Sequence, residues 1–328
     1  MLTGPRWYAD AVTRTSTLAT LIALAACSRT PAPAPSPVVS AAPAAATPAV
    51  ADAGAGEGAK ACPGDPARGV TCLRFAKTED AFRHALRGDP KVLAVGEAHA
   101  QKGTEAIASS TKRFTEQLLP LIAERSGDIV VELWAPDPKC RKEVKAVASA
   151  QKPVTETQAA TNTNEYETLG IEAKARGLTP WLLRPTCDDF SMLADAGADA
   201  VPAMLGLVKR LTQQKVMQLV EKNAKANKLS IAYGGAMHND VSPAEATAAY
   251  SFGPELARAV GGAYVELDLI VPELVKKTPV WEKLPWFSAW EADADADEAR
   301  KSQTTLYAIA NGPSLPPSYV LVFPATVR

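Results

Sequence analysis

Two of the three histidines in the sequence follow short apolar runs in the same way. Gly96-Glu97-Ala98-His99 comes directly after Val92–Val95, and Gly235-Ala236-Met237-His238 comes shortly after Leu229–Tyr233. Each is a Gly-x-x-His motif placed where an apolar strand would end. Because ligands of open α/β sheets bind at the carboxyl ends of the strands, we expect His99 and His238 to share one pocket.

Three further ionisable residues stand at predicted strand ends. Glu97 lies two positions before His99, so both side chains share a face if the backbone is extended there. Glu132 interrupts the apolar run Val130–Trp134, where a charge is costly unless it is paired or ligated. Arg184 ends another run and is suited to clamp a substrate carboxylate or an oxyanion. A structural salt bridge between Glu132 and Arg184 is the alternative.

These residue types suit three kinds of chemistry. His99, His238, Glu97 and Glu132 together make an acceptable open site for zinc, manganese or iron, whose bound water would be activated. Without a metal, Glu97 or His99 is a candidate general base and Arg184 a candidate oxyanion donor. If the ligand is haem, His99 or His238 would be its axial ligand.

The elements that must position these residues alternate along the chain. The longer stretches 104–125, 164–176 and 203–227 have helical spacing of apolar residues. Strands are expected at shorter apolar runs, namely Lys91–Gly96, Asp128–Leu133, Thr179–Leu183, Leu229–Tyr233, Ala263–Ile270 and Tyr319–Phe323. This alternation predicts an α/β fold with a mostly parallel central sheet flanked by helices. The polar region 137–163 gives no clear pattern.

The N-terminus predicts export and a lipid anchor. Residues 1–26 combine positive charge with the apolar run Leu18–Ala26, which is too short to span a bilayer as a helix. Leu24-Ala25-Ala26-Cys27 has the form of a lipobox, so we expect cleavage before Cys27 and lipid on that cysteine. An ordinary cleaved signal with a chance cysteine is the alternative. Ser28 favours the outer membrane, with the protein facing the periplasm or the cell surface.

The rest of the chain divides into a tether and a folded part. Residues 27–60 are rich in Ala and Pro and are expected to form a disordered tether. Residues 61–328 are long enough for a single α/β domain with a Trp-rich C-terminal extension. The net charge of -1 and the pI of about 6.4 give no reason to expect nucleic acid as a partner. The expected partners are the membrane, through the lipid, and a small-molecule or peptide ligand.

Four cysteines remain once Cys27 is assigned to lipid, and an oxidising compartment favours two disulfides. The short loop between Cys62 and Cys72 makes these two the expected pair. Cys140 then pairs with Cys187 by default. A metal site is the weaker interpretation, because the spacings match no zinc pattern.

Several other features of the sequence are candidates for the site. Glu266 and Asp268 alternate on one strand face, and a half-solvated edge strand is the favoured interpretation. The acidic run Glu291–Glu298 is expected to be a solvated turn, and His84 to lie on an exposed helix without a functional role. Four aromatic residues in the C-terminal part of the sequence are expected to pack against the sheet rather than to form a lid. They are Trp281, Trp286, Phe287 and Trp290.

The paired motifs resemble those of the Tiki/TraB superfamily, which includes the ChaN-like haem-binding lipoproteins and the erythromycin esterases. Val95-Gly96-Glu97-Ala98-His99 is similar to the Gly-Glu-x-His opening of the ChaN-like branch, and Gly235-Ala236-Met237-His238 resembles the later motif of the group. The match runs from Val92 to about Asp240.

The resemblance implies a fold of that type with five residues lining the cleft, namely Glu97, His99, Glu132, Arg184 and His238. It implies a hydrolase of peptide or ester bonds, expected to depend on a divalent metal. The alternative is a non-catalytic haem- or iron-binding lipoprotein. A degenerate member that serves only as a binding or structural surface is the third possibility.

Overall fold

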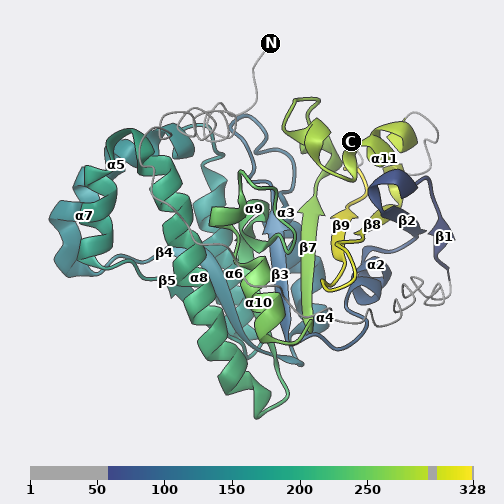
Figure 1. Cartoon of the computed structure of the whole chain (residues 1–328), viewed down its shortest axis with the longest axis horizontal. Coiled ribbons are helices and arrows are strands. Elements are labelled where there is room, and N and C mark those ends of the chain that lie inside the picture. Colours follow the sequence, from purple (N-terminus) through teal and green to yellow (C-terminus); the bar gives the residue numbers. More distant parts are fainter. Residues whose placement is uncertain (1–57, 295–300, 327–328) are drawn as a thin grey trace, which may run out of the picture.

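The computed structural model describes residues 58–294 and 301–326 of the chain. Its described part is an α/β fold in which helices cover both faces of one mixed sheet (Figure 1). The strands lie side by side in the order β1-β2-β8-β9-β7-β3-β6-β4-β5. Their bounds are Lys60–Ala61 (β1), Val70–Phe75 (β2), Val92–Glu97 (β3), Ser126–Trp134 (β4), Thr179–Leu183 (β5), Leu229–Gly235 (β6), Tyr264–Ile270 (β7), Thr304–Ile309 (β8) and Ser318–Val322 (β9).

The parallel part of the sheet comprises β9, β7, β3, β6, β4 and β5. All the strands predicted from the sequence belong to it. The other end differs, because β1, β2, β8 and β9 pair antiparallel. A mostly parallel sheet therefore describes only one end of the structure. The likeness to the erythromycin esterases and ChaN stays a prediction.

Successive residues of β3 point to opposite faces, and each face has its own helices. Leu93 and Val95 pack with the helices on one face, and Val92 and Ala94 pack on the other. The first face is covered by α2 (Thr78–Ala85), α3 (Ser110–Arg113), the π-helical η2 (Phe114–Leu118), α4 (Leu119–Ile122) and α6 (Thr161–Ala175). The second is covered by α8 (Ala200–Ala224), α9 (Ala236–Asn239) and α10 (Gly253–Ala259).

The polar region 137–163, unassigned from sequence, contains α5 (Arg141–Thr155) and the start of α6. Helix α5 packs against α7 (Cys187–Asp195), and these two helices project at the left of Figure 1. The disulfide Cys140–Cys187 joins the two segments, and Cys62–Cys72 joins β2 to the segment before it. Both predicted pairs are confirmed.

The Trp-rich segment is part of the fold rather than an extension. Trp286 is buried and stacks on Tyr307 of β8, with ring centroids 6.0 Å apart. The predicted packing against the sheet is confirmed. The predicted solvated turn at Glu291–Glu298 is wrong for its first residues, because α11 (Phe287–Ala294) continues through them. Asp293 on this helix is buried and pairs with Arg74 of β2.

The predicted start of the folded part is slightly late, because Lys60 already pairs with Arg74 across β1 and β2. Cys27, the signal and most of the tether lie outside the described residues. Short 3-10 turns connect several elements, namely Pro66–Arg68, Pro138–Cys140, Gly197–Asp199, Ala248–Tyr250, Pro272–Leu274 and Trp281–Lys283.

Within the described ranges, no single helix has the length and apolarity to cross a membrane. The two helices Cys187–Asp195 and Gly197–Ala224 together meet both criteria, but they are bent by 118° relative to each other.

Candidate functional site

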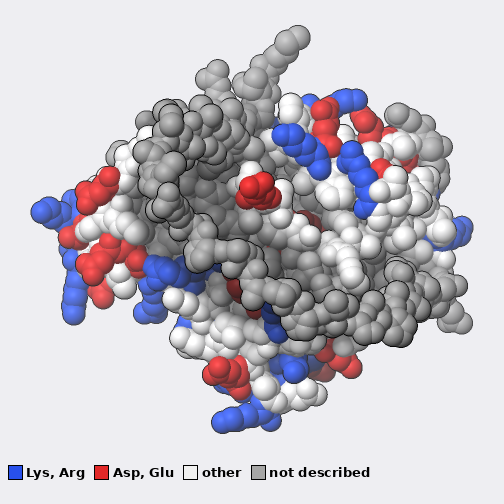
Figure 2. All heavy atoms as spheres, viewed as in Figure 1, with Lys and Arg blue, Asp and Glu red and all other residues white. Residues whose placement is uncertain are grey.

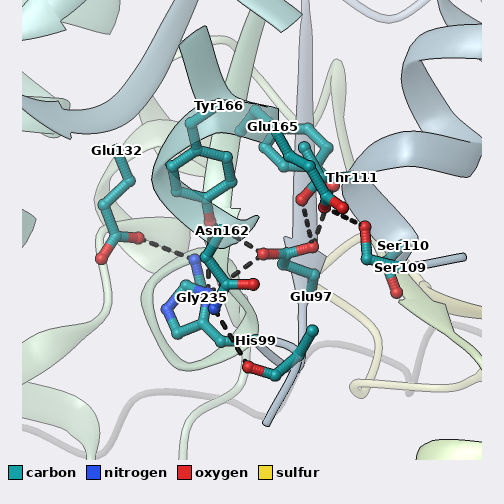
Figure 3. A network of polar contacts seen from close by, with 12 residues as sticks. Glu97, His99, Ser109, Ser110, Thr111, Glu132, Asn162, Glu165, Tyr166 and Gly235 are labelled. Atoms are coloured by element: carbon teal, nitrogen blue, oxygen red, sulfur yellow. Dashed lines mark hydrogen bonds and ion pairs between the residues drawn. The ribbon is translucent and has the colours of Figure 1, made fainter. Parts of the chain in front are cut away.

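The strand order brings the two histidine motifs together. Strand β6 lies between β3 and β4, so its carboxyl end is flanked by the ends of both neighbours. Glu97 is the last residue of β3, Glu132 lies near the end of β4, and His238 follows β6 on α9. The predicted grouping of Glu97, His99, Glu132 and His238 at one sheet edge is therefore observed. Figure 3 shows the first three of these side chains.

Glu97 is 4% exposed, and its carboxylate accepts four hydrogen bonds. The Oε1 atom accepts from the Tyr166 hydroxyl at 2.9 Å and lies 3.0 Å from Nδ1 of His99. The Oε2 atom accepts from Thr111 at 2.6 Å and from Tyr233 at 3.2 Å. Burial raises the pKa of Glu97, but the hydrogen bond and charge of His99 and the hydroxyl donors outweigh it and lower the pKa. Glu97 is therefore held as a carboxylate in a fixed orientation.

His99 takes its orientation from Glu97. Burial lowers the pKa of His99, but the hydrogen bond and charge of Glu97, with a smaller contribution from Glu132, raise it above its ordinary value. Because Nδ1 faces Glu97, the neutral imidazole carries its hydrogen on Nδ1 and leaves Nε2 as an acceptor. The side chain remains 18% exposed. The Glu97–His99 pair thus has the arrangement of a carboxylate-supported base.

Glu132 is held by the backbone of β6. Its Oε2 accepts a hydrogen bond from the Gly235 amide at 2.7 Å, and its Oε1 lies 3.8 Å from Nε2 of His238. The second histidine has its own anchor, because Nδ1 of His238 lies 2.8 Å from the Tyr250 carbonyl oxygen. In the neutral imidazole, Nδ1 therefore donates to Tyr250 and Nε2 faces Glu132. His238 is 4% exposed.

The side chains converge beside Gly235. A methyl group placed on this glycine would lie 3.5 Å from Nε2 of His99, 3.7 Å from Oε2 of Glu132 and 3.8 Å from Cδ2 of His238. All three groups therefore lie within 4 Å of the Cβ position that Gly235 leaves empty. Because this position is one bond length from the Gly235 Cα, a reacting group would lie next to it, close to both imidazoles and one carboxylate.

Arg184 does not join this group. It follows β5 at the sheet edge, where β4 separates it from β6, and its side chain is exposed. Among the described residues no ion pair joins it to Glu132, which interacts with Gly235 and His238 instead. The alternative of a structural Glu132–Arg184 salt bridge is therefore wrong. Strands β4 and β5 are neighbours as expected, but the Glu132 side chain turns to the other neighbour of β4, where it accepts from Gly235 of β6.

The site includes hydroxyl groups that the sequence analysis did not assign to it. Tyr166 comes from α6, Thr111 from α3 and Tyr233 from β6, and all three are buried. Figure 3 shows Glu132 and Thr111 on opposite sides of the Glu97–His99 pair. Tyr233 directly precedes the second motif, so its position in the sequence was a usable signal. Tyr166 and Thr111 lie on helices, and the packing of these helices over β3 follows only from the tertiary structure.

The predicted ligand set does not fit a bound metal as it stands. Within the described ranges, no group of three or more His, Cys, Asp and Glu side chains has the geometry to hold an ion. The reason is visible at Glu97, whose two oxygens are occupied by His99 and three hydroxyl donors. Glu132 has one oxygen committed to the Gly235 amide. The Glu132 oxygen nearest the convergence point is this same Oε2, and the other oxygen, Oε1, lies 3.8 Å from Nε2 of His238.

The two histidines differ in their fit to haem. An axial haem ligand needs an imidazole with an open approach to Nε2. His238 is 4% exposed, so its packing does not fit an axial ligand. The His99 side chain is 18% exposed, so haem ligation by His99 stays a prediction.

Gly234 is required by the position of Glu132. A methyl group on Gly234 would lie 2.3 Å from Oε2 of Glu132, far inside van der Waals contact. Gly234→Ala is therefore expected to displace Glu132 and to lower the free energy of unfolding by about 1–3 kcal/mol, the usual cost of overpacking. Urea unfolding measures this change.

Gly206→Ala on α8 is the matched control, because a methyl group there meets nothing within 4 Å. It is expected to raise stability by about 1 kcal/mol through helix propensity. Equal effects of the two substitutions would contradict the assigned packing of Gly234.

Strand β7 carries a buried acid, Glu266, and a partly buried one, Asp268, on the sheet face opposite to the Glu97 side chain. Strand β7 lies between β9 and β3, so the prediction that Glu266 and Asp268 occupy a half-solvated edge strand is wrong. Glu266 is 5% exposed and accepts from the Val241 amide and from Ser318. Burial raises the pKa of Asp268 to about 7, although Asn239 donates a hydrogen bond to it. Burial and the charge of Asp268 also raise the pKa of Glu266.

Asp268 makes stability depend on pH. Its pKa is about 7 in the folded chain and ordinarily 3.8, so folding holds a proton that the unfolded chain releases. The free energy of unfolding that Asp268 contributes therefore falls progressively as pH rises from about 4 to about 7. Above that pH its contribution stays constant. Asp268→Asn, which still accepts from Asn239, is expected to reduce the fall in urea midpoint between pH 5 and pH 8. An unchanged fall would show that Asp268 titrates normally.

His84 lies on α2 against Phe75, with ring centroids 5.5 Å apart. It is half-buried, and burial followed by the charge of Arg87 lowers its pKa. The exposed helix expected from the sequence is therefore only partly exposed at this residue. His84 is absent from the network around Glu97.

No protein-family model matches the sequence, and no curated protein matches it either. A crystal structure of a protein from Bacillus cereus is similar with a TM-score of 0.35 and 11% sequence identity. The similarity covers 77% of this chain and 94% of that one.

Proposed function

We propose that this protein is a hydrolase of ester or peptide bonds, in which His99, supported by Glu97, is the general base. The observation that carries the proposal is the contact of 3.0 Å between Nδ1 of His99 and Oε1 of a buried, fully hydrogen-bonded Glu97. This contact leaves Nε2 as an acceptor at the point beside Gly235 where the groups converge. A positioned imidazole of this kind accelerates proton transfer by about 10²–10⁴-fold.

The chemical steps use residues of this chain. Nε2 of His99 removes a proton from a water molecule while the water oxygen bonds to the carbonyl carbon of the substrate. The carbon–oxygen or carbon–nitrogen bond to the leaving group then breaks, and His99 gives the same proton to the departing oxygen or nitrogen. Glu97 stabilises the imidazolium between these two transfers. Glu132, whose Oε2 lies near the same point, and the neighbouring His238 orient the water.

The sequence motifs support the same proposal. They resemble those of a superfamily that includes esterases and divalent-metal proteases. The role of Arg184 as an oxyanion donor has no support, because this side chain is exposed beyond β4. Since the donor set does not fit a metal as it stands, no step is assigned to a metal or to haem.

The test begins with the purified full-length protein and a panel of chromogenic esters and short peptides. We expect hydrolysis of at least one member and its loss in His99→Asn. The metal content of the same preparation and a haem absorbance titration test the other hypotheses. Activity that persists in His99→Asn would overturn the proposal. Stoichiometric metal that disappears in both His99→Ala and His238→Ala would replace it with a metallohydrolase.

We also propose that the site works while tethered to a membrane by lipid on Cys27. The support is the lipobox-like Leu24-Ala25-Ala26-Cys27 and the Ala/Pro-rich segment that follows it. Mass spectrometry of the N-terminal peptide from cells should find diacylglycerol on Cys27. An unmodified Cys27 would contradict this part of the proposal.

A further inference from the structure

The imidazole of His99 is oriented by contacts at short range. Figure 2 shows acidic and basic side chains mixed over the described part of one face, and salt screens exposed charges of this kind beyond about 10 Å. They therefore give a partly buried imidazole no preferred orientation. Glu97 supplies one contact, at Nδ1. A single hydrogen bond leaves the ring free to tilt, so a second contact at the same nitrogen would fix its plane.

Tyr166 makes this second contact. Its hydroxyl oxygen lies 3.3 Å from Nδ1 of His99 and 2.9 Å from Oε1 of Glu97. Because Nδ1 and Oε1 are themselves 3.0 Å apart, the three atoms form a closed triangle (Figure 3). The rings of Tyr166 and His99 also meet edge to face, with centroids 6.1 Å apart and planes at 71°. Tyr166 therefore contacts the imidazole through both its hydroxyl and its ring.

The hydrogens of this triangle determine the tautomer of His99. Burial and the charges of Glu97 and Glu132 hold the pKa of Tyr166 well above its ordinary value, so the hydroxyl keeps its one hydrogen and donates it to Glu97, which can only accept. The hydroxyl oxygen then accepts from Nδ1 of His99, whose hydrogen is shared with Oε1. If Nδ1 carried no hydrogen, the Tyr166 hydrogen would satisfy only one of Nδ1 and Oε1. The triangle therefore favours the tautomer with its hydrogen on Nδ1.

Helix α6 holds His99 at two points. Asn162, one turn before Tyr166, donates through Nδ2 to the Ala100 carbonyl oxygen at 3.1 Å, and the amide of Ala159 donates to the same oxygen at 2.8 Å. Because residues four apart share a helix face, the start of α6 fixes the backbone next to His99 while Tyr166 reaches its ring. Tyr166 is 5% exposed, so its hydroxyl is held away from water.

We infer that Tyr166 is a positioning residue of the site, which holds the His99 imidazole with its hydrogen on Nδ1 and with Nε2 free to accept a proton. This inference rests on the hydrolase proposed above and deepens it by assigning the group that fixes the tautomer of the base. The other tautomer carries a hydrogen on Nε2 and cannot take a proton from water there. Glu97 stabilises the imidazolium, and Tyr166 fixes the plane and the tautomer of the neutral ring.

The experiment compares two variants of the full-length protein. Tyr166→Phe removes the hydroxyl and keeps the ring against His99. Tyr233→Phe is the matched control, because Tyr233 is also a buried tyrosine that donates to Glu97, at 3.2 Å, and among the described residues no hydrogen bond joins it to His99. Each variant removes one hydroxyl donor of Glu97, so the difference between them measures the contact with His99. Nitrogen NMR of the substrate-free protein, at a pH where the ring is neutral, shows which nitrogen of His99 carries the hydrogen.

The unaltered protein and Tyr233→Phe are expected to carry the hydrogen on Nδ1, and Tyr166→Phe to show a mixture of both tautomers. With similar KM, kcat should be about tenfold lower in Tyr166→Phe than in Tyr233→Phe, the size of one hydrogen bond to a charged group. The same tautomer in all three proteins, or equal kcat in the two variants of an active protein, would overturn the inference.

A second measurement needs no variant. In the unaltered protein, the Nδ1 hydrogen of His99 should show a nuclear Overhauser contact with the ring hydrogens of Tyr166. Its absence would overturn the inference even if Tyr166→Phe does not fold. A change of tautomer in Tyr166→Phe, in a protein that hydrolyses no member of the panel, would overturn the proposed hydrolase and leave the positioning of His99 by Tyr166 standing.

Discussion

His99→Asn is expected to lower kcat/KM for an ester substrate by about 10²–10⁴-fold, the contribution of a positioned general base. Asparagine retains a polar group near Glu97 but offers no basic nitrogen beside Gly235. Binding of the substrate should change less than its turnover, because Glu132 and His238 keep their anchors at Gly235 and Tyr250. The measurement is steady-state kinetics on the substrate found in the panel, with KM and kcat determined separately.

His84→Asn is the control for this prediction. His84 lies on α2 against Phe75, outside the network of Glu97, so its replacement should leave kcat/KM within about twofold, as expected for a change away from the reacting atoms. A loss in His84→Asn equal to that in His99→Asn would indicate a general effect of histidine removal on folding. Far-ultraviolet circular dichroism of both variants separates the two explanations.

Glu97→Gln is expected to have the second-largest effect, on both stability and activity. The carboxylate accepts hydrogen bonds from Thr111, Tyr166 and Tyr233 as well as from His99. A glutamine amide would turn its N–H groups toward some of these donors. Burying an unsatisfied donor of this kind costs about 1–3 kcal/mol in the free energy of unfolding. Urea denaturation should show the loss.

The same substitution removes the charge that raises the pKa of His99. The pKa of His99 should therefore fall, and the rising limb of kcat/KM against pH should move to lower pH. The maximal rate should also fall, because glutamine cannot stabilise the imidazolium. Glu167→Gln, on the exposed side of α6, should change neither stability nor pH profile. An unshifted profile in Glu97→Gln would contradict the coupling of Glu97 to His99.

The parallel strands could be predicted because burial on both faces makes them continuous apolar runs, as in Val92–Val95. Strand β2 was missed for the opposite reason. The sequence of β2, with Thr71 and Arg74 among apolar residues, reads as a surface segment until β8 pairs with it. The interrupted helix in 104–125 begins only at Ser110 and has a π-helical turn, which the periodic pattern did not reveal.

The site was predictable in its motifs but not in its pairings. Gly-x-x-His at two strand ends indicated that His99 and His238 would meet, and they do. The sequence offered Arg184 as one partner for Glu132, and the strands β4 and β5 that lead to them are neighbours, but nothing in it indicated that the Gly235 amide of β6 binds Glu132 from the other side. The hydroxyl groups that hold Glu97 come from helices packed across β3, and their roles follow from that packing alone.

The central claim is that the imidazole of His99 is the base whose neutral form drives hydrolysis. The most direct test is a pair of pH titrations, one of kcat/KM and one of the His99 imidazole by nitrogen NMR in the substrate-free protein. The predicted result is a rate that rises with pH at the same pKa as the His99 titration, above the ordinary histidine value of about 6.5. Rates that rise at a pKa different from that of His99, or that stay constant while His99 titrates, would contradict the claim.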